Sequence, residues 1–432
     1  MDKLKVVLKN NFVQGIIVIA GGTAAAQIIN ALFAPIITRV YSPEDFGILT
    51  LFAAILGILA IISSFKYESG VAIADDEKKA INVLVLSVII LVFFVLTTFF
   101  ILHFVGDYIF KLFTDISIPM YQILIPLGVF LTGLYTIFTQ WALRTKNYKT
   151  LSKTKLTQSL VQNLTKIVLG TLSFGPVGLI FGNILGQSLG ITKLSSPLTR
   201  NKKTFFSLID RKIIYWCAKR YIRFPLYSAP SQLLNNLGLQ LPILFMTTLY
   251  GSATIGYYGL ANTIVNLPMN LIGRSVADVF YAEAASAGRE DPMKLKKLAR
   301  KVFHKLFLIG IIPSVILLFL GPYLFSVVFG DIWYESGVYS RIIAILVFSR
   351  LVFTPITKVF SVFEKQKDEL VFDILKVILI LLVYLIVLFF SLNSYWFVGL
   401  YSGIMSIIYC LTFQRAMKII NKEIEKRQVI NI

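Results

Sequence analysis

The chain has 432 residues, of which 56% are hydrophobic and only 15% are charged, so a water-soluble fold could not cover its own exterior with polar side chains. Its 14% aromatic residues and only 14 prolines exclude a disordered chain. The remaining class is an all-α integral membrane protein with many spans. Basic cytoplasmic loops then explain the net charge of +20. A nucleic-acid partner is not indicated, because the sequence has no basic stripe mixed with stacking aromatics.

The apolar runs of the sequence predict twelve membrane-spanning helices, because about twenty apolar residues are enough to cross the hydrocarbon core. In chain order they lie near residues 15–38, 46–65, 82–105, 119–142, 155–173, 177–194, 227–249, 255–284, 303–328, 335–363, 370–391 and 395–418. The first run is too long for the apolar region of a signal peptide, so we keep it as a span.

The loop charges predict the orientation of these spans. With the N-terminus in the cytoplasm, most of the 42 Lys and Arg fall in loops on that side. The opposite loops at 174–176, 250–254 and 392–394 carry no charge at all. Because twelve is an even number, we expect both termini in the cytoplasm.

The basic stretch 193–223 divides the chain near its midpoint, with six predicted spans on each side. The segment from Pro35 to Gly47 resembles the one from Pro242 to Gly259, which indicates an internal duplication. Two halves of the same orientation predict two six-helix bundles facing each other across a central cleft. We expect an N-terminal bundle over 1–194, a basic cytoplasmic linker over 195–226 and a C-terminal bundle over 227–432.

The sequence lacks the motifs of an enzyme or a metal site. It contains no Asp-x-Asp, HExxH, GxSxG or P-loop pattern, and its two cysteines and two histidines have no metal-ligand spacing. We therefore expect no catalytic residue, metal or cofactor. In the sixth span, a glycine stripe at every fourth position predicts close helix packing; it consists of Gly178, Gly182, Gly186 and Gly190.

Three cations lie too deep in predicted spans to be explained by loops: Arg350, Arg274 and Lys166. Arg350 is halfway along the tenth span, about 20 Å from either end, which is beyond the reach of its side chain. Asp278 follows Arg274 by one turn and is its candidate charge partner. These residues are candidates for lining a polar cavity.

Shallower cations form a second group of candidates, because long side chains within about two turns of a membrane face also reach water. This group consists of Arg39, Arg341 and Lys358. In the first bundle Glu68 is the candidate acid, near the cytoplasmic edge. A cavity lined by cations favours an anionic substrate, since the guanidinium fork matches phosphate oxygens.

Four segments resemble the polysaccharide-biosynthesis flippases, the Wzx-type O-antigen translocases of the MOP exporter superfamily. They are Arg39-Val-Tyr-Ser-Pro-Glu-Asp-Phe-Gly47, the stretch from Lys66 to Asp76, the stretch from Leu143 to Tyr148, and the stretch from Gly256 to Tyr281. The four segments occur in the same order as in that family, and the resemblance, including the number of spans, extends over essentially the whole chain.

The resemblance implies two six-helix bundles in a V around a central cavity, in the bacterial inner membrane. It also implies a substrate, an undecaprenyl-pyrophosphate-linked oligosaccharide, with membrane lipids, a polysaccharide polymerase and a chain-length regulator as partners. Two transporter alternatives stay open, a MATE-like antiporter of cationic drugs and a lipid II-type flippase. A polymerase enzyme is the poorest alternative, because every predicted external loop is short.

Overall fold

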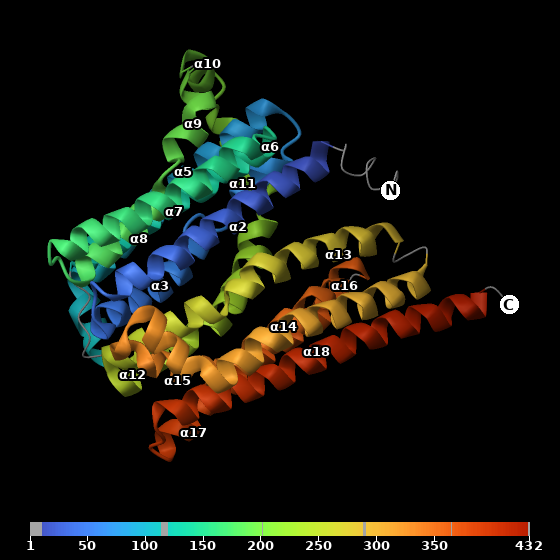
Figure 1. The fold of residues 1–432 in the computed structure, drawn as a ribbon. Helices are drawn as coiled ribbons and strands as arrows, with labels where there is room; N and C mark the ends of the chain where they lie inside the picture. The colour runs from blue at the N-terminus through green and yellow to red at the C-terminus, as the bar shows by residue number, and fades with distance from the viewer. Residues whose placement is uncertain (1–10, 114–119, 201, 288–290, 364, 431–432) are drawn as a thin grey trace. The chain divides into compact units, whose positions relative to one another are not determined.

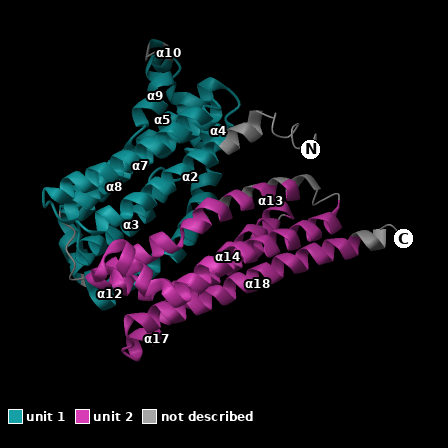
Figure 2. Cartoon of the chain, in the orientation of Figure 1, with its two compact units in different colours: residues 1–252 teal, residues 253–432 magenta. Residues whose placement is uncertain are grey.

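The computed structural model describes residues 11–113, 120–200, 202–287, 291–363 and 365–430. All regular elements within these residues are helical, with no strand among them (Figure 1). The contacts divide the chain into two compact units, residues 1–252 and 253–432 (Figure 2). The prediction of an all-α protein with many membrane spans is confirmed.

Unit 1 is built from helices of very different lengths. They are α2 (Asn11–Thr38), α3 (Pro43–Ile62), α4 (Ser69–Ile73), α5 (Glu77–Phe113), α6 (Tyr121–Arg144), α7 (Tyr148–Thr171), α8 (Pro176–Ser188), α9 (Ile191–Arg200), α10 (Lys202–Ser207), α11 (Arg211–Arg220), the π-helical turn η1 (Phe224–Ser228) and the first part of α12 (Ala229–Val265). The predicted linker 195–226 is therefore largely helical.

Unit 2 begins within α12 and continues to the C-terminal helix. It contains the π-helical turn η2 (Met269–Gly273), α13 (Arg274–Ala287), α14 (Pro292–Phe329), η3 (Asp331–Trp333), α15 (Tyr334–Phe353), η4 (Thr354–Lys358), α16 (Val359–Val362), α17 (Gln366–Phe389) and α18 (Ser394–Ile430). Helices α14, α15 and α18 pack against one another (Figure 1).

The boundary between the units falls at a kink in α12. Gly251 has φ +81° and ψ 178°, a conformation that glycine adopts easily and that interrupts the helix. The uncharged external loop predicted at 250–254 is therefore a kink between two stretches of helix. The sequence predicts a different division, at 195–226, which separates two six-helix bundles of a membrane protein. That division stays a prediction.

Nine helices of the described residues are long and apolar enough to cross a membrane, and each coincides with a predicted span. The three predicted spans outside this set are 155–173, 227–249 and 255–284, all of them helical in the structure. These three segments carry amides and hydroxyls along their length, which lowers their hydropathy. Polar spans of this kind are tolerated where they face protein or a polar cavity and not lipid.

The starts of several helices are set by capping residues. Ser42 and Asp45 form a capping box at the start of α3, with Pro43 in its first turn. At the start of α5 the backbone N–H of Lys79 donates to Asp76 at 2.7 Å, and at the start of α14 the N–H of Lys294 donates to its aspartate, Asp291, at 2.9 Å. The helices at the third and ninth predicted spans thus both begin after an aspartate that accepts from a backbone N–H three residues later.

The glycine stripe of the sixth span packs where the sequence predicts close approach. Gly178, Gly182 and Gly186 are buried in α8, and α8 packs against α7. A Cβ on Gly182 would meet the Lys166 side chain and the backbone of α7. Gly190 differs, because it has φ +106° and lies in the turn between α8 and α9.

Candidate substrate-binding site

Arg350 is a half-buried cation in the span formed by α15. Its Nη1 donates to Oδ1 of Asn266 across 3.5 Å, which is at the long limit for a hydrogen bond. It forms no ion pair with any residue that the structure describes. A guanidinium carries five N–H donors, so most of this fork stays available for a ligand.

The surroundings of Arg350 within unit 2 are polar but uncharged. The Asn266 side chain is held by Asn262: Nδ2 of Asn266 donates hydrogen bonds of 2.7 Å to the backbone carbonyl and to Oδ1 of Asn262. The buried Tyr258 and Tyr401 lie close enough to Arg350 for an electrostatic interaction. Shortly after Asn266 the chain forms the π-helical turn η2, and turns of this kind are frequent at functional sites. The arrangement is suited to an anion that also offers hydroxyl groups.

Lys166 is a second buried cation, in unit 1. Its residue is 7% exposed in α7, and it forms no ion pair with a described residue. The described buried residues include two carboxylates, Glu68 and Asp373, and each of these has a lysine within 4 Å. Lys166 is thus a buried charge without a counter-charge among the described residues, an arrangement that is costly in a membrane.

A buried polar stripe on α7 leads to Lys166. The stripe consists of Thr154, Gln158, Ser159, Asn163 and Lys166; apart from the adjacent pair Gln158 and Ser159, successive members are three or four residues apart on one side of the helix. Asn30 of α2 accepts hydrogen bonds of 2.7 Å from the side chains of both Ser159 and Asn163. Our sequence analysis missed Asn30, Ser159 and Asn163, although amides and hydroxyls at helical spacing within an apolar run were a visible signal.

The shallower candidates lie at exposed positions. Arg39 follows α2 in a turn, and Lys358 ends the 3-10 turn η4. Arg341 donates from Nη2 to the carbonyl of Phe319 at 2.9 Å. Arg341, Arg350 and Lys358 come from one continuous segment, α15 to η4, and Arg39 and Lys166 belong to unit 1.

The predicted charge partners have different outcomes. Arg274 and Asp278 are in α13, but their side chains lie outside the described residues. Glu68 accepts a hydrogen bond of 2.5 Å from Ser64 and lies 3.6 Å from the ammonium of Lys66. Its partner is therefore a neighbouring loop lysine and none of the candidate cations.

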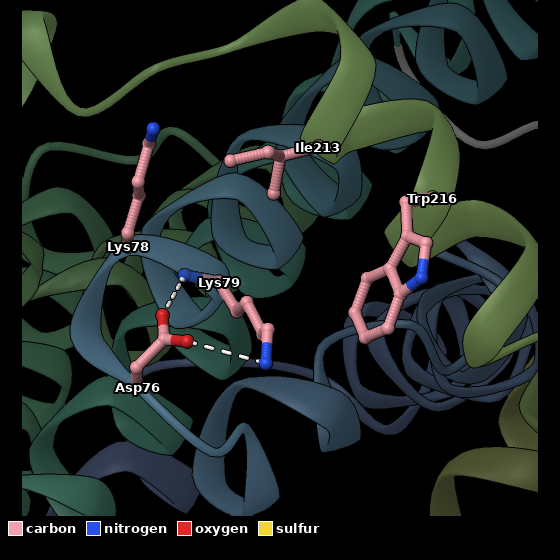
Figure 3. Close-up of a pocket in the computed structure, with 5 residues that line it drawn as sticks. All are labelled: Asp76, Lys78, Lys79, Ile213 and Trp216. Carbon is pink, nitrogen blue, oxygen red and sulfur yellow. Dashed lines mark hydrogen bonds and ion pairs between the residues drawn. The ribbon is translucent and has the colours of Figure 1, made fainter.

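A pocket of about 300 Å³ lies where α11 packs against the start of α5, and five residues line it: Asp76, Lys78, Lys79, Ile213 and Trp216 (Figure 3). The hydrogen bond from the Lys79 backbone N–H and the nearby Lys79 ammonium hold the pKa of the Asp76 carboxyl below its usual value. The same ammonium lies 5.2 Å from the centroid of the Trp216 ring. Lys78 lies 3.8 Å from Asp210. Because its charges already have partners, we assign this pocket a structural role in fixing α11.

Among the described residues, no cluster of three His, Cys, Asp or Glu side chains is arranged to hold a metal ion. Cys217 is fully buried, and this burial raises the pKa of its thiol from 9.0 to about 11. Cys217 and Cys410 are both free thiols.

Comparison with solved structures identifies the fold. The fold is similar to a multidrug resistance MATE family transporter of the MOP superfamily in an inward-facing conformation, with a TM-score of 0.75 and 16% identity over 92% of this chain and 96% of that one. It is also similar to the lipid II flippase MurJ, with a TM-score of 0.74 and 14% identity over 93% and 87% of the two chains. The chain thus has the fold of a MOP superfamily transporter.

A third similar structure is a MOP superfamily transporter from Pyrococcus furiosus, described as having a binding pocket of reverse polarity. It has a TM-score of 0.66 and 15% identity over 95% of this chain and 96% of that one. No curated protein sequence matches the chain at the significance we required.

A family model gives the particular family. The model described as polysaccharide biosynthesis protein matches residues 36–338, which is most of the chain. The chain belongs to this family. Two of the structures with a similar fold are a MATE family transporter and the lipid II flippase MurJ.

Proposed function

We propose that this protein translocates undecaprenyl-pyrophosphate-linked oligosaccharide repeat units from the cytoplasmic to the outer leaflet by alternating access. The repeat units would supply O-antigen, capsule or exopolysaccharide assembly. In this proposal the protein lies in the bacterial inner membrane with both termini in the cytoplasm. A polysaccharide polymerase and a chain-length regulator then act on the delivered units.

The observation that carries the proposal is the state of Arg350. A mid-span guanidinium that makes one hydrogen bond of 3.5 Å is far from satisfied. An arginine at this depth is costly unless it meets a polar cavity or a negative charge. The pyrophosphate of a lipid carrier supplies that charge in the fork geometry that arginine binds best.

The polar spans support an oligosaccharide as the other part of the substrate. Helix α7 carries the buried stripe that ends at Lys166. Asn262 lies in the last turn of α12, and Asn266 directly follows that helix. Amides and hydroxyls of this kind hydrogen-bond sugar hydroxyls, and they belong to predicted spans outside the nine described helices that are apolar enough to cross a membrane.

A cation antiporter is the alternative from another transporter class, and it is less well supported. A site for cationic drugs needs a buried carboxylate without a partner. Glu68 lies 3.6 Å from Lys66, and Asp373 lies 2.8 Å from Lys376, so both carboxylates already have a cation. A lipid II-type flippase shares the pyrophosphate carrier, and the experiment below separates it from our proposal.

Deletion of the gene in its own host tests the proposal. We expect an undecaprenyl-pyrophosphate oligosaccharide to accumulate on the inner leaflet while surface polysaccharide is lost and cell-wall synthesis continues. Extraction of the lipid-linked saccharides and mass spectrometry identify what accumulates. Accumulation of lipid II, or unchanged saccharides together with sensitivity to cationic drugs, would each refute the proposal.

A further inference from the structure

The first turns of α14 carry a dense group of cations that the transport site does not use. Between Pro292 and Phe307 there are six Lys and Arg and no acid; they are Lys294, Lys296, Lys297, Arg300, Lys301 and Lys305. All but Lys296 are exposed, and none forms an ion pair with a residue that the structure describes. We refer to these six residues as the α14 basic segment.

The exposed apolar surface of α14 shows how deep this segment lies. Exposed large side chains cover the helix from Phe307 to Val328, which at 1.5 Å per residue is about 32 Å. This length matches the roughly 30 Å hydrocarbon core of a bilayer. The α14 basic segment therefore ends, at Lys305, within one turn of the membrane core, and Lys301 and Lys305 lie at the depth of lipid headgroups.

Part of this segment lines a pocket between α13 and α14. The pocket has a volume of about 230 Å³, and it is lined by Glu283, Lys294, Leu295, Lys297, Leu298 and Lys301. Lys294, Lys297 and Lys301 are three and four residues apart and so share one side of the helix. Three cations against one carboxylate make the pocket a site for an anion. The exposed apolar side of α14 continues from Phe307 and offers a surface for acyl chains.

The general excess of Lys and Arg on one side of the membrane does not explain this pattern by itself. Helix α18 ends on the same predicted side with Lys418, Lys422 and Lys426, but Glu423 and Glu425 lie among them. Lys426 is ion-paired with Glu423 at 2.7 Å. The α14 basic segment has no acid among its own residues; Asp291, which caps the helix, precedes it, and the segment adjoins a pocket.

We propose that the α14 basic segment binds the headgroup of an anionic phospholipid in the leaflet that this end of α14 faces. The phosphodiester would be held by Lys297 and Lys301, with Lys294 at the outer end of the pocket. The acyl chains would lie against the apolar side chains that begin at Phe307. Clusters of four to eight cations directly beside a membrane span are typical of anionic lipid recognition. This inference does not depend on which substrate the protein transports.

Native mass spectrometry of the full-length protein released from nanodiscs of equimolar phosphatidylglycerol and phosphatidylcholine tests this proposal. We expect phosphatidylglycerol to be retained selectively by the wild type. In Lys297→Gln/Lys301→Gln we expect retention to fall roughly tenfold or more, since each surface cation contributes about fivefold to anionic lipid binding. The matched control is Lys418→Gln/Lys422→Gln, which removes two exposed lysines from α18 and should retain phosphatidylglycerol as the wild type does.

Three outcomes would overturn the proposal. The first is equal retention of the two lipids by the wild type, which would mean that the headgroup charge is not recognised. The second is an equal loss of phosphatidylglycerol in both double variants, which would indicate general electrostatic attraction. The third is full displacement of phosphatidylglycerol by inorganic phosphate added to the buffer, which would assign the pocket to a soluble anion. Because all six cations lie on the surface or near it, the Gln variants should fold normally.

Discussion

Arg350→Ala is expected to abolish surface polysaccharide while the protein still reaches the membrane in normal amounts. Each hydrogen bond between a guanidinium and a phosphate oxygen contributes about 1.5–3 kcal/mol, so the loss of a bidentate contact should reduce transport at least roughly 100-fold. Stability should change little, because the described side chain makes one hydrogen bond of 3.5 Å. The measurements are surface polysaccharide on gels and the amount of protein in the membrane.

Two further variants separate recognition of the anion from loss of a charge. Arg350→Lys keeps the charge but removes the fork, and we expect it to restore only part of the transport. Arg211→Ala removes an exposed arginine from α11, outside the proposed substrate-binding site, and should behave as the wild type. Normal surface polysaccharide with Arg350→Ala would remove this residue from the mechanism.

Lys166→Met is expected to stabilise the protein and, at the same time, to impair transport strongly. Lys166 is buried without a counter-charge among the described residues, and a lysine in the membrane centre costs about 2.5–3.5 kcal/mol on insertion scales. Methionine has a similar length and no charge, so we expect the free energy of unfolding to rise by roughly 1–3 kcal/mol. Thermal unfolding of the purified protein and surface polysaccharide in cells measure the two effects.

The control for this prediction is Lys376→Met. Lys376 is half-buried in α17 and lies 2.8 Å from Asp373, so its removal leaves a buried carboxylate without its partner. That variant should be destabilised, since breaking a buried ion pair leaves an uncompensated charge. A lower melting temperature for Lys166→Met together with normal transport would show that Lys166 is a structural residue and does not bind substrate.

Most helices of this protein could be predicted from the sequence, because a membrane-spanning helix requires a long run of apolar residues. Helices occur at all twelve predicted spans, and the aspartate caps of α5 and α14 repeat between the halves. The kink at Gly251 was not predictable as a kink. An uncharged stretch of five residues looks the same in sequence whether it forms a loop or a bent helix.

The candidate site could be predicted only in part. Depth along a span identified Arg350 and Lys166, because an isolated cation in an apolar run is conspicuous. The same argument does not identify neutral partners such as Asn30 and Asn266, whose importance depends on which helices pack together. It also could not assign Glu68 to Lys66, since that pairing depends on two residues with left-handed backbone conformation, Phe65 and Lys66.

The central proposal is that Arg350 and Lys166 bind a pyrophosphate-linked oligosaccharide that the protein moves across the membrane. The most direct test is translocation in proteoliposomes, using the lipid-linked saccharide extracted from the deletion strain and labelled on its sugar. An enzyme that cannot cross the bilayer and that cleaves only the outward-facing saccharide reports the translocated fraction. Wild-type protein should expose the labelled saccharide over time, and Arg350→Ala should match protein-free vesicles. Equal exposure by the wild type and by protein-free vesicles would contradict the account.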